Sequence, residues 1–251
     1  MVTVKSEEHI KSMRIAGKIL AETLELVSRS AKPGMSTKEL DDIAYDYIVR
    51  QNHAVPSFLN YDGFPATMCT SIDDEIVHGI PSKHRILQEG MLLKLDCGVG
   101  WNGYHTDAAR TVAIGKVSPE KQKLMDVTKE CFFEGIKVLK NGVRLGDLGH
   151  AIQMHAEKHG FSVVRELVGH GIGTTVHEDP NVPNYGIPGR GMRVCTNMTL
   201  AIEPMINVGK REIAYGSDDG WTIVTMDGSP SAHYENTVVI TDDGVEILTL
   251  L

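Results

Sequence analysis

The N-terminal part of the chain carries apolar residues at helical spacing. Over residues 6–30 these are Ile10, Met13, Ile15, Ile19, Leu20, Leu24 and Val27. The spacing predicts one long amphipathic helix with Ser6 as its N-cap. A Pro-Gly turn at 33–34 follows. A second helix is predicted to begin after Ser36, where Glu39 completes a capping box.

From Met68 to Ile114 the pattern changes to short apolar runs separated by glycines, which predict strands and hairpins. Helices then return. Ser118 followed by Pro119 has the cap-then-proline form of a helix start. Because helices and strands come in blocks, we expect an α/β fold of the α+β kind.

The second half of the chain repeats the first faintly and in the same order. Each half runs through helix, turn, helix, a strand with a histidine, a strand that ends in an acid, and an acid that leads into a strand. We interpret this as an internal duplication within a single domain over 1–251, whose pseudo-symmetric halves, about 1–115 and 116–251, pack their sheets around one central site. The echoes are VHGIP from Val77 with VHEDP from Val176, MLLKLD ending at Asp96 with MTLAIE ending at Glu203, and DAARTVAI from Asp107 with ENTVVITDDG from Glu235.

Four carboxylates are expected to meet at that centre. Leu92–Leu95 resemble a buried strand, yet Asp96 follows directly, and we expect no lysine or arginine beside it on its own face. A buried, ionised carboxylate is unfavourable without a nearby positive charge. The duplication brings three more acids to the same place, and four acids cannot be ionised together unless cations are present. These three are Asp107, Glu203 and Glu235.

His170 adds an imidazole to the four acids. It is flanked by glycines in GHGIG, where the backbone can approach closely. Two divalent cations would balance the four negative charges. A mostly oxygen ligand set with one imidazole suits Mn, Fe(II) or Co better than a thiolate-rich structural zinc site. Two such ions bridged by carboxylates are a hydrolytic arrangement, so the sequence predicts a dinuclear hydrolase centre.

Composition limits the other classes of function. The chain has 251 residues, of which 41% are hydrophobic and 23% charged, and its net charge is -8. The negative net charge argues against a protein built to bind a nucleic-acid backbone. Four scattered cysteines without a C-x-x-C pair indicate neither a disulfide framework nor a cysteine zinc site, so we expect a cytoplasmic protein. The first twenty residues lack the apolar core of a signal peptide, and no stretch is apolar enough for a membrane span.

The five predicted ligands, together with the phrases VHGIP, GHGIG, IEPM and HYENTVVIT, resemble type I methionine aminopeptidases of peptidase family M24, in their short bacterial form. The resemblance covers essentially the whole chain. It implies the pita-bread fold, one catalytic domain, and removal of the initiator methionine from nascent proteins when the second residue is small. It also implies two divalent metal ions, which could be Co, Mn, Fe(II) or Zn.

The resemblance implies a role for each ligand. Asp96 would chelate one metal, His170 and Glu203 would hold the other, and Asp107 and Glu235 would bridge the two. Glu203 would also take a proton from the attacking water.

Histidines and a side-chain pocket complete the implied site. His78 and His177 would flank the scissile peptide, orienting its nitrogen and stabilising its carbonyl oxygen. The pocket for the methionine side chain is implied at Tyr61, Phe64, Cys69 and Trp221.

Two departures from familiar members stand out. Val176 precedes His177 at a position where an aromatic residue is common, so the pocket wall could be wider. The loop around Asp73 and Glu75, which with Ser231 often holds a monovalent cation in this family, is more acidic than usual.

Alternatives remain at this point. One is an X-Pro aminopeptidase or prolidase of the same fold, although those usually carry a large additional N-terminal domain. Another is a non-catalytic binding protein of the fold, which would have lost metal ligands.

His155 and His159, one helical turn apart, are interpreted as a solvated helix face. The expected partners are N-terminal methionine peptides and nascent proteins, with a transient ribosome contact, no specific nucleic acid, no membrane, and a monomeric enzyme.

Overall fold

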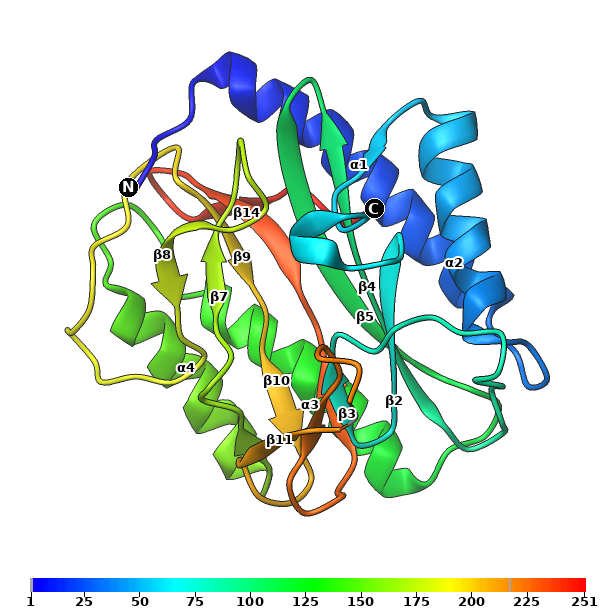
Figure 1. Cartoon of the computed structure of the whole chain (residues 1–251). Coiled ribbons are helices and arrows are strands. Elements are labelled where there is room, and N and C mark those ends of the chain that lie inside the picture. Colours follow the sequence, from blue (N-terminus) through cyan, green and yellow to red (C-terminus); the bar gives the residue numbers. More distant parts are fainter. Residues whose placement is uncertain (1, 217) are drawn as a thin grey trace.

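Two larger β-sheets meet in the middle of the molecule, and helices pack behind each of them (Figure 1). The computed structural model describes residues 2–216 and 218–251. The helices are α1 (Glu7–Ser30), α2 (Thr37–Tyr45), α3 (Pro119–Ile136) and α4 (Leu145–Lys158), with a π-helical turn η1 (Asp46–Gln51) and a 3-10 turn η2 (Tyr61–Gly63).

Short strands surround two long ones. In chain order they are β1 (Val55–Pro56), β2 (Met68–Ile72), β3 (Glu75–Val77), β4 (Leu92–Trp101), β5 (Tyr104–Ala113), β6 (Ser162–Val163), β7 (Gly169–Gly171), β8 (Glu178–Val182), β9 (Thr199–Ile202), β10 (Met205–Asn207), β11 (Ile213–Tyr215), β12 (Ile223–Thr225), β13 (Ser231–His233), β14 (Asn236–Ile240) and β15 (Val245–Ile247).

The first sheet is built around β4, which pairs antiparallel with β1, β2 and β5. Leu93 and Leu95 pack into a core shared with α1 and α2. Since side chains alternate along a strand, Lys94 and Asp96 point to the other face, toward the centre of the molecule. The expectation that no basic residue shares the face of Asp96 is therefore wrong, because Lys94 lies on it two residues earlier.

The second sheet has the strand order β15-β14-β9-β7-β8. Its outer side shares a core with α3 and α4, in which Leu200, Ile202 and Val238 from β9 and β14 meet Phe132 and Leu148 from the helices. The two smaller sheets, β13-β10-β6 and β11-β12-β3, continue from its lower end in Figure 1.

Matching features recur in the two halves. At the start of α2, the Glu39 carboxylate accepts a hydrogen bond from the Ser36 N–H at 2.7 Å. At the start of α4, the Asp147 carboxylate accepts one from the Arg144 N–H at 3.2 Å. Both capping positions also form an isolated β-bridge to a later segment. These shared details are those expected of pseudo-symmetric halves.

A reciprocal backbone pair joins the two sheets. The Ala109 N–H donates to the Glu235 carbonyl oxygen at 3.3 Å, and the Glu235 N–H donates to the Ala109 carbonyl oxygen at 3.0 Å. Ala109 lies on β5 and Glu235 immediately precedes β14. The pair brings acids from opposite halves of the chain to one centre.

The sequence-based elements are largely confirmed. Ser6, Ser36 and Ser118 each cap the helix predicted for them. The segment 68–114 forms β2 to β5 as expected. The π-helical turn η1 after α2 has no counterpart in the sequence-based expectation. None of the helices in residues 2–216 and 218–251 is long and apolar enough to cross a membrane.

Candidate metal centre

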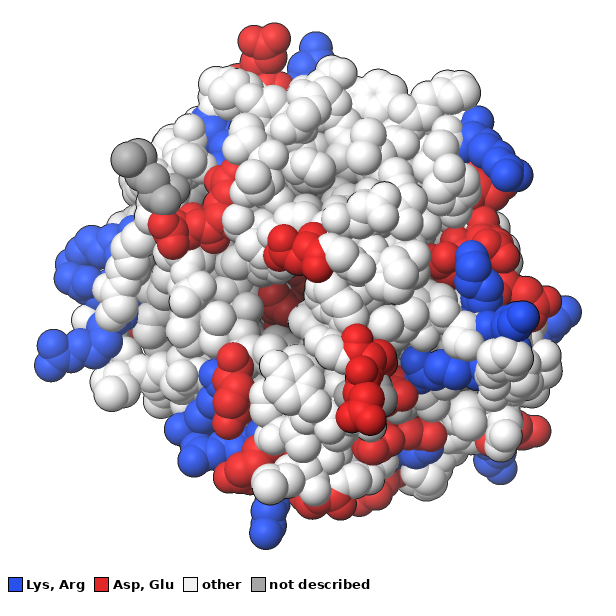
Figure 2. Space-filling view, viewed as in Figure 1, with Lys and Arg blue, Asp and Glu red and all other residues white. Residues whose placement is uncertain are grey.

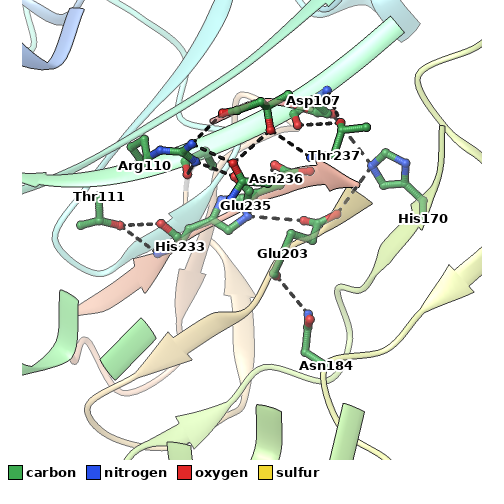
Figure 3. Close-up of polar contacts among 12 residues, drawn as sticks. Asp107, Arg110, Thr111, His170, Asn184, Glu203, His233, Glu235, Asn236 and Thr237 are labelled. Atoms are coloured by element: carbon green, nitrogen blue, oxygen red, sulfur yellow. Dashed lines mark hydrogen bonds and ion pairs between the residues drawn. The ribbon is translucent and has the colours of Figure 1, made fainter. Parts of the chain in front are cut away.

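The five predicted ligands come from the two sheets and line one cavity. Figure 3 shows four of them, Asp107, His170, Glu203 and Glu235, pointing toward one another. Asp96 and Asp107 lie on the inner face of the β4–β5 hairpin. His170 is the middle residue of β7, Glu203 directly follows β9, and Glu235 directly precedes β14. The β-ladder sets these positions, because His170 pairs with Ala201 and Asn236 pairs with Ile202 in neighbouring strands.

Ligand atoms from these residues lie close enough to share a cation. One atom each from Asp107, His170 and Glu235 lie within 4.8 Å of one another. His170 Nε2 is 3.6 Å from Glu203 Oε1 and 3.9 Å from Asp107 Oδ2. His170 Nδ1 is 2.9 Å from the Gly171 carbonyl oxygen, which fixes the ring and leaves Nε2 facing the acids.

Three of the acids have a buried oxygen without a hydrogen-bond partner. In the described part of the chain, no hydrogen-bond partner is found for Asp96 Oδ1, Asp107 Oδ1 or Glu235 Oε1, and all three are buried. A buried carboxylate oxygen without a donor is strongly disfavoured. Divalent cations would satisfy these oxygens, so the donor set fits the predicted metals.

The pKa values of the four acids are raised, because burial disfavours their charged forms. Burial raises the pKa of Asp96 to about 7 and that of Glu203 to about 8. Burial, and then the charges of Asp96 and Glu203, raise the pKa of Asp107 well above its usual range. Glu235 is raised well above its range by burial and then by Asp107. Bound cations would reverse the direction of these shifts by stabilising the charged forms.

A cavity of about 160 Å³ opens onto these acids. Figure 2 shows it as a hollow with acidic atoms at its floor. This volume is comparable to that of engineered cavities of about 150 Å³ that hold one benzene, so there is room for a single side chain. The residues that line it, besides the five predicted ligands, are Phe58, Tyr61, Asp62, Phe64, Cys69, His78, His177 and Trp221.

All four predicted pocket residues therefore lie in the cavity wall. The Phe64 and Trp221 rings meet edge to face, with centroids 5.2 Å apart. Phe58 and Asp62 were missed, although they belong to the same segment as Tyr61. Val176 is buried and does not line the cavity.

His78 and His177 stand at the cavity in different ways. His177 Nδ1 is 2.9 Å from the Tyr61 hydroxyl oxygen. When Tyr61 donates this hydrogen bond, His177 keeps its proton on Nε2 and can donate it to an oxygen. His78 adopts a left-handed backbone conformation, φ 62°, which is unusual for a non-glycine residue and is often found at functional sites. Burial lowers the pKa of His78 to about 4, so it is neutral at pH 7.

His233 is a further residue that the sequence reasoning missed. It is buried, and its Nε2 lies 3.5 Å from Glu203 Oε2 and 3.9 Å from Glu235 Oε2. Neither ring nitrogen has a hydrogen-bond partner among the described residues. Its signal was present in the sequence, since it opens the phrase HYENTVVIT that contains Glu235.

His155 and His159 lie outside this centre. His155 Nε2 is 2.9 Å from Glu130 Oε2, and the two histidine rings have centroids 4.5 Å apart. These three residues are partly or fully exposed on α3 and at the end of α4, and they could hold a metal ion of their own. None of them lines the cavity.

Comparison with known proteins places this geometry in a family. The model of metallopeptidase family M24 matches residues 11–242. The chain belongs to metallopeptidase family M24. Within it, the methionine aminopeptidase of Clostridium acetobutylicum is 55% identical over 250 residues, covering 100% of this chain and 99% of that protein.

Solved structures agree with the assignment. The methionine aminopeptidase of Thermotoga maritima superimposes with a TM-score of 0.98 at 39% identity, with 100% of each chain covered. The X-Pro aminopeptidase of the same organism has a TM-score of 0.77 at 22% identity, covering 99% of this chain and 62% of that one. This second likeness shows a shared fold only.

These findings confirm the predicted family and the pita-bread fold. Membership in a metallopeptidase family makes the chain a hydrolase that uses divalent metal ions, which is the cofactor class expected from the four acids. The full-length relatives are methionine aminopeptidases, so the X-Pro aminopeptidase alternative and the non-catalytic alternative are not favoured.

Proposed function

We propose that this protein removes the N-terminal methionine from peptides and nascent proteins whose second residue is small. The observation that carries the proposal is the group of buried acids, three of them with an unpartnered oxygen, at the floor of a cavity with room for one side chain. The names of its full-length relatives support methionine as that side chain.

We assign the metal-binding roles as the family resemblance implies. Asp96 would chelate one ion, His170 and Glu203 the other, and Asp107 and Glu235 both. His233, whose Nε2 faces Glu203 and Glu235, is a candidate additional ligand. The oxygen-rich donor set suits Mn, Fe(II) or Co, and Zn also fits it. When bound, divalent ions in such a pair lower the pKa of water and polarise the substrate carbonyl.

Glu203 is the proposed proton acceptor. Its pKa of about 8 in the metal-free protein shows a carboxyl held in a desolvated position, and its side chain keeps 13% exposure at the cavity. A carboxylate there can accept a proton from the attacking water and return it to the leaving amine. His170 Nε2 lies 3.6 Å from Glu203 Oε1, which fits the proposal that the two side chains bind the same ion.

The cavity wall would select the substrate. The aromatic edges of Phe64 and Trp221, together with buried Cys69, form an apolar surface for the methionine side chain. Neutral His78 and Tyr61-bound His177 would flank the scissile bond and leave little width for a large second side chain. Because Val176 is not part of the cavity wall, it is not expected to relax that limit.

Nascent proteins as substrates imply a cytoplasmic enzyme, and we retain that expectation together with a monomeric state and a transient contact with the ribosome. We also propose that the whole chain, 1–251, acts as one catalytic domain, because ligands from both halves meet at the same centre.

A substrate panel tests the proposed function. Methionine should be released from Met-Ala-Ser, while Met-Leu-Ser should be more than about 100-fold slower in kcat/KM, because a steric clash rejects a side chain more strongly than a missing methylene does. An X-Pro dipeptide should not be cleaved. Equal kcat/KM for the two tripeptides would contradict the width argument, and efficient cleavage of the dipeptide would favour the X-Pro alternative.

Replacing His78 or His177 by alanine should slow the reaction without releasing metal. A loss of about 10²–10³-fold in kcat is typical when one donor to the reacting oxygen is removed. Kinetics with Met-Ala-Ser and metal analysis of the same purified variants measure the two effects. His170→Ala is the matched control and should lose metal. If His78→Ala or His177→Ala also loses metal, that histidine is a ligand.

A further inference from the structure

Lys94 is a buried lysine that the proposed reaction does not use. Its exposure is 1%, and it is among the largest of the fully buried side chains described. It lies on β4 two residues before Asp96 and points to the same inner face. A buried lysine is rare unless its amine is well paired, so its contacts need an explanation.

The amine of Lys94 bridges two segments that are far apart in the sequence. Its Nζ donates hydrogen bonds to the carbonyl oxygen of Asp73, at 2.7 Å, and to that of Ser231, at 3.2 Å. Asp73 lies between β2 and β3, and Ser231 begins β13. The Ser231 N–H also donates to the Asp73 carbonyl oxygen, at 3.0 Å, so both segments meet at this point.

The family resemblance places a monovalent cation near these residues, but the side chains of Asp73 and Ser231 form hydrogen bonds within the protein. Asp73 Oδ1 accepts hydrogen bonds from Lys121 Nζ at 2.5 Å and from the Leu92 N–H at 3.0 Å. The Ser231 hydroxyl donates to a backbone carbonyl oxygen at 3.2 Å.

Glu75, the other acid expected near the monovalent cation, also has hydrogen-bond partners. Its carboxylate accepts hydrogen bonds from Arg85 and from the Ile72 N–H, the latter at 2.6 Å. Lysine and arginine side chains thus balance the charges of Asp73 and Glu75.

Converging backbone carbonyls are ligands that suit an alkali cation, since they replace its hydration shell. Here the two carbonyls converge on Lys94 Nζ instead. We propose that the Lys94 amine is a built-in replacement for a monovalent cation and makes this enzyme independent of potassium and sodium. It is a positioning residue, since its Nζ contacts no predicted ligand.

The segments that Lys94 joins all lead to functional residues. β4 carries Asp96, β3 runs directly into His78, and β13 leads to Glu235.

Burial lowers the pKa of the Lys94 amine to about 7, and Glu75, Asp73 and Asp74 act in the opposite direction. The amine donates hydrogen bonds to the two carbonyl oxygens in either protonation state, so the contact persists through neutral pH.

Alkali-cation rescue tests this proposal. Lys94→Ala should open the space between the two carbonyl oxygens. In choline chloride, its kcat/KM should fall about tenfold, which corresponds to about 1.4 kcal/mol, and potassium or sodium chloride at equal ionic strength should restore most of the loss. The melting temperature of the metal-free variant should rise in the same salts, which gives a measure that does not require activity.

Two variants serve as matched controls. Lys94→Met fills the space with an apolar side chain, so it should show the loss without the rescue. Lys121→Ala removes a positive charge beside Asp73 but leaves the carbonyl pair occupied, so it should show no dependence on alkali cations.

The unmodified protein can also be tested directly, which does not depend on whether the Lys94 variants fold. Its kcat/KM and melting temperature should be the same in potassium, sodium and choline chloride. Dependence of the unmodified protein on potassium or sodium would overturn the proposal. So would a Lys94→Ala variant that folds and is either unimpaired in choline chloride or impaired in all three salts alike.

Discussion

Exhaustive removal of divalent metal is expected to abolish methionine release from Met-Ala-Ser. Buried oxygens of Asp96, Asp107 and Glu235 have no hydrogen-bond donor among the described residues, so cations are expected to hold these acids in their charged, metal-binding form. Activity should return on titration with Mn, Fe(II), Co or Zn salts under conditions that exclude oxygen for iron. Full turnover after dialysis against a chelator, with residual metal measured in the same sample, would refute the dinuclear centre.

The titration needs one control. Glu130, His155 and His159 form a separate group that could hold a metal ion away from the cavity. His155→Ala should remove any ion bound there and leave activity unchanged, so that the remaining stoichiometry reports on the cavity alone. Two ions per chain are expected in this background.

Metal removal should also make the stability of the protein depend on pH. The pKa values of Asp96, about 7, and Glu203, about 8, lie above those of acids in an unfolded chain. The folded protein therefore holds more protons, and its free energy of unfolding falls as pH rises from about 6.5 to 8.

Groups with lowered pKa values act in the opposite direction. Buried histidines such as His78 do so below their ordinary pKa of 6.5, and Lys94, whose pKa is lowered to about 7, does so above that value. The one lysine is outweighed by the four acids, whose pKa values are all raised. Melting temperatures of the metal-free protein over this range should decline with increasing pH, and those of the metal-loaded protein should decline less. A rise with pH in the metal-free protein would contradict the assigned shifts.

Glu203→Gln should reduce kcat by at least about 10³-fold, within the range for loss of a general acid–base group and with a metal ligand weakened in addition. Because the lost interaction belongs to the transition state, kcat should fall more than KM rises. Kinetics with Met-Ala-Ser and metal analysis together measure the effect. Glu130→Gln, the same change outside the cavity, is the control. A near-normal kcat in Glu203→Gln would mean that another group accepts the proton.

Much of the centre could be predicted because its residues stand at strand ends in recurring phrases. Asp96 and Glu203 each end an apolar run, and an acid in that position has few structural explanations. The helices were predictable for a similar reason, since caps such as Ser6 and Ser36 act within one turn. Both kinds of signal are local in sequence.

What could not be predicted depends on contacts between distant segments. Lys94 was overlooked because its partners, the carbonyls of Asp73 and Ser231, carry no side-chain signature. His233 was overlooked because only the pairing of β13 with β10 turns its ring toward Glu203. The backbone is chemically uniform, so sequence patterns do not reveal which carbonyls will converge.

The reciprocal backbone pair between Ala109 and Glu235 can form only after both halves of the chain have been made, which limits when during synthesis the site can form. The N-terminal half contributes only Asp96 and Asp107, and the remaining ligands follow from His170 onward. Closing contacts over such long stretches of chain is slow and occurs late. During translation, the partly made chain therefore carries Asp96 and Asp107 before the other predicted ligands exist, and the proposed metal pair could assemble only after Glu235 has left the exit tunnel. Uptake of both proposed ions would thus report that folding is complete.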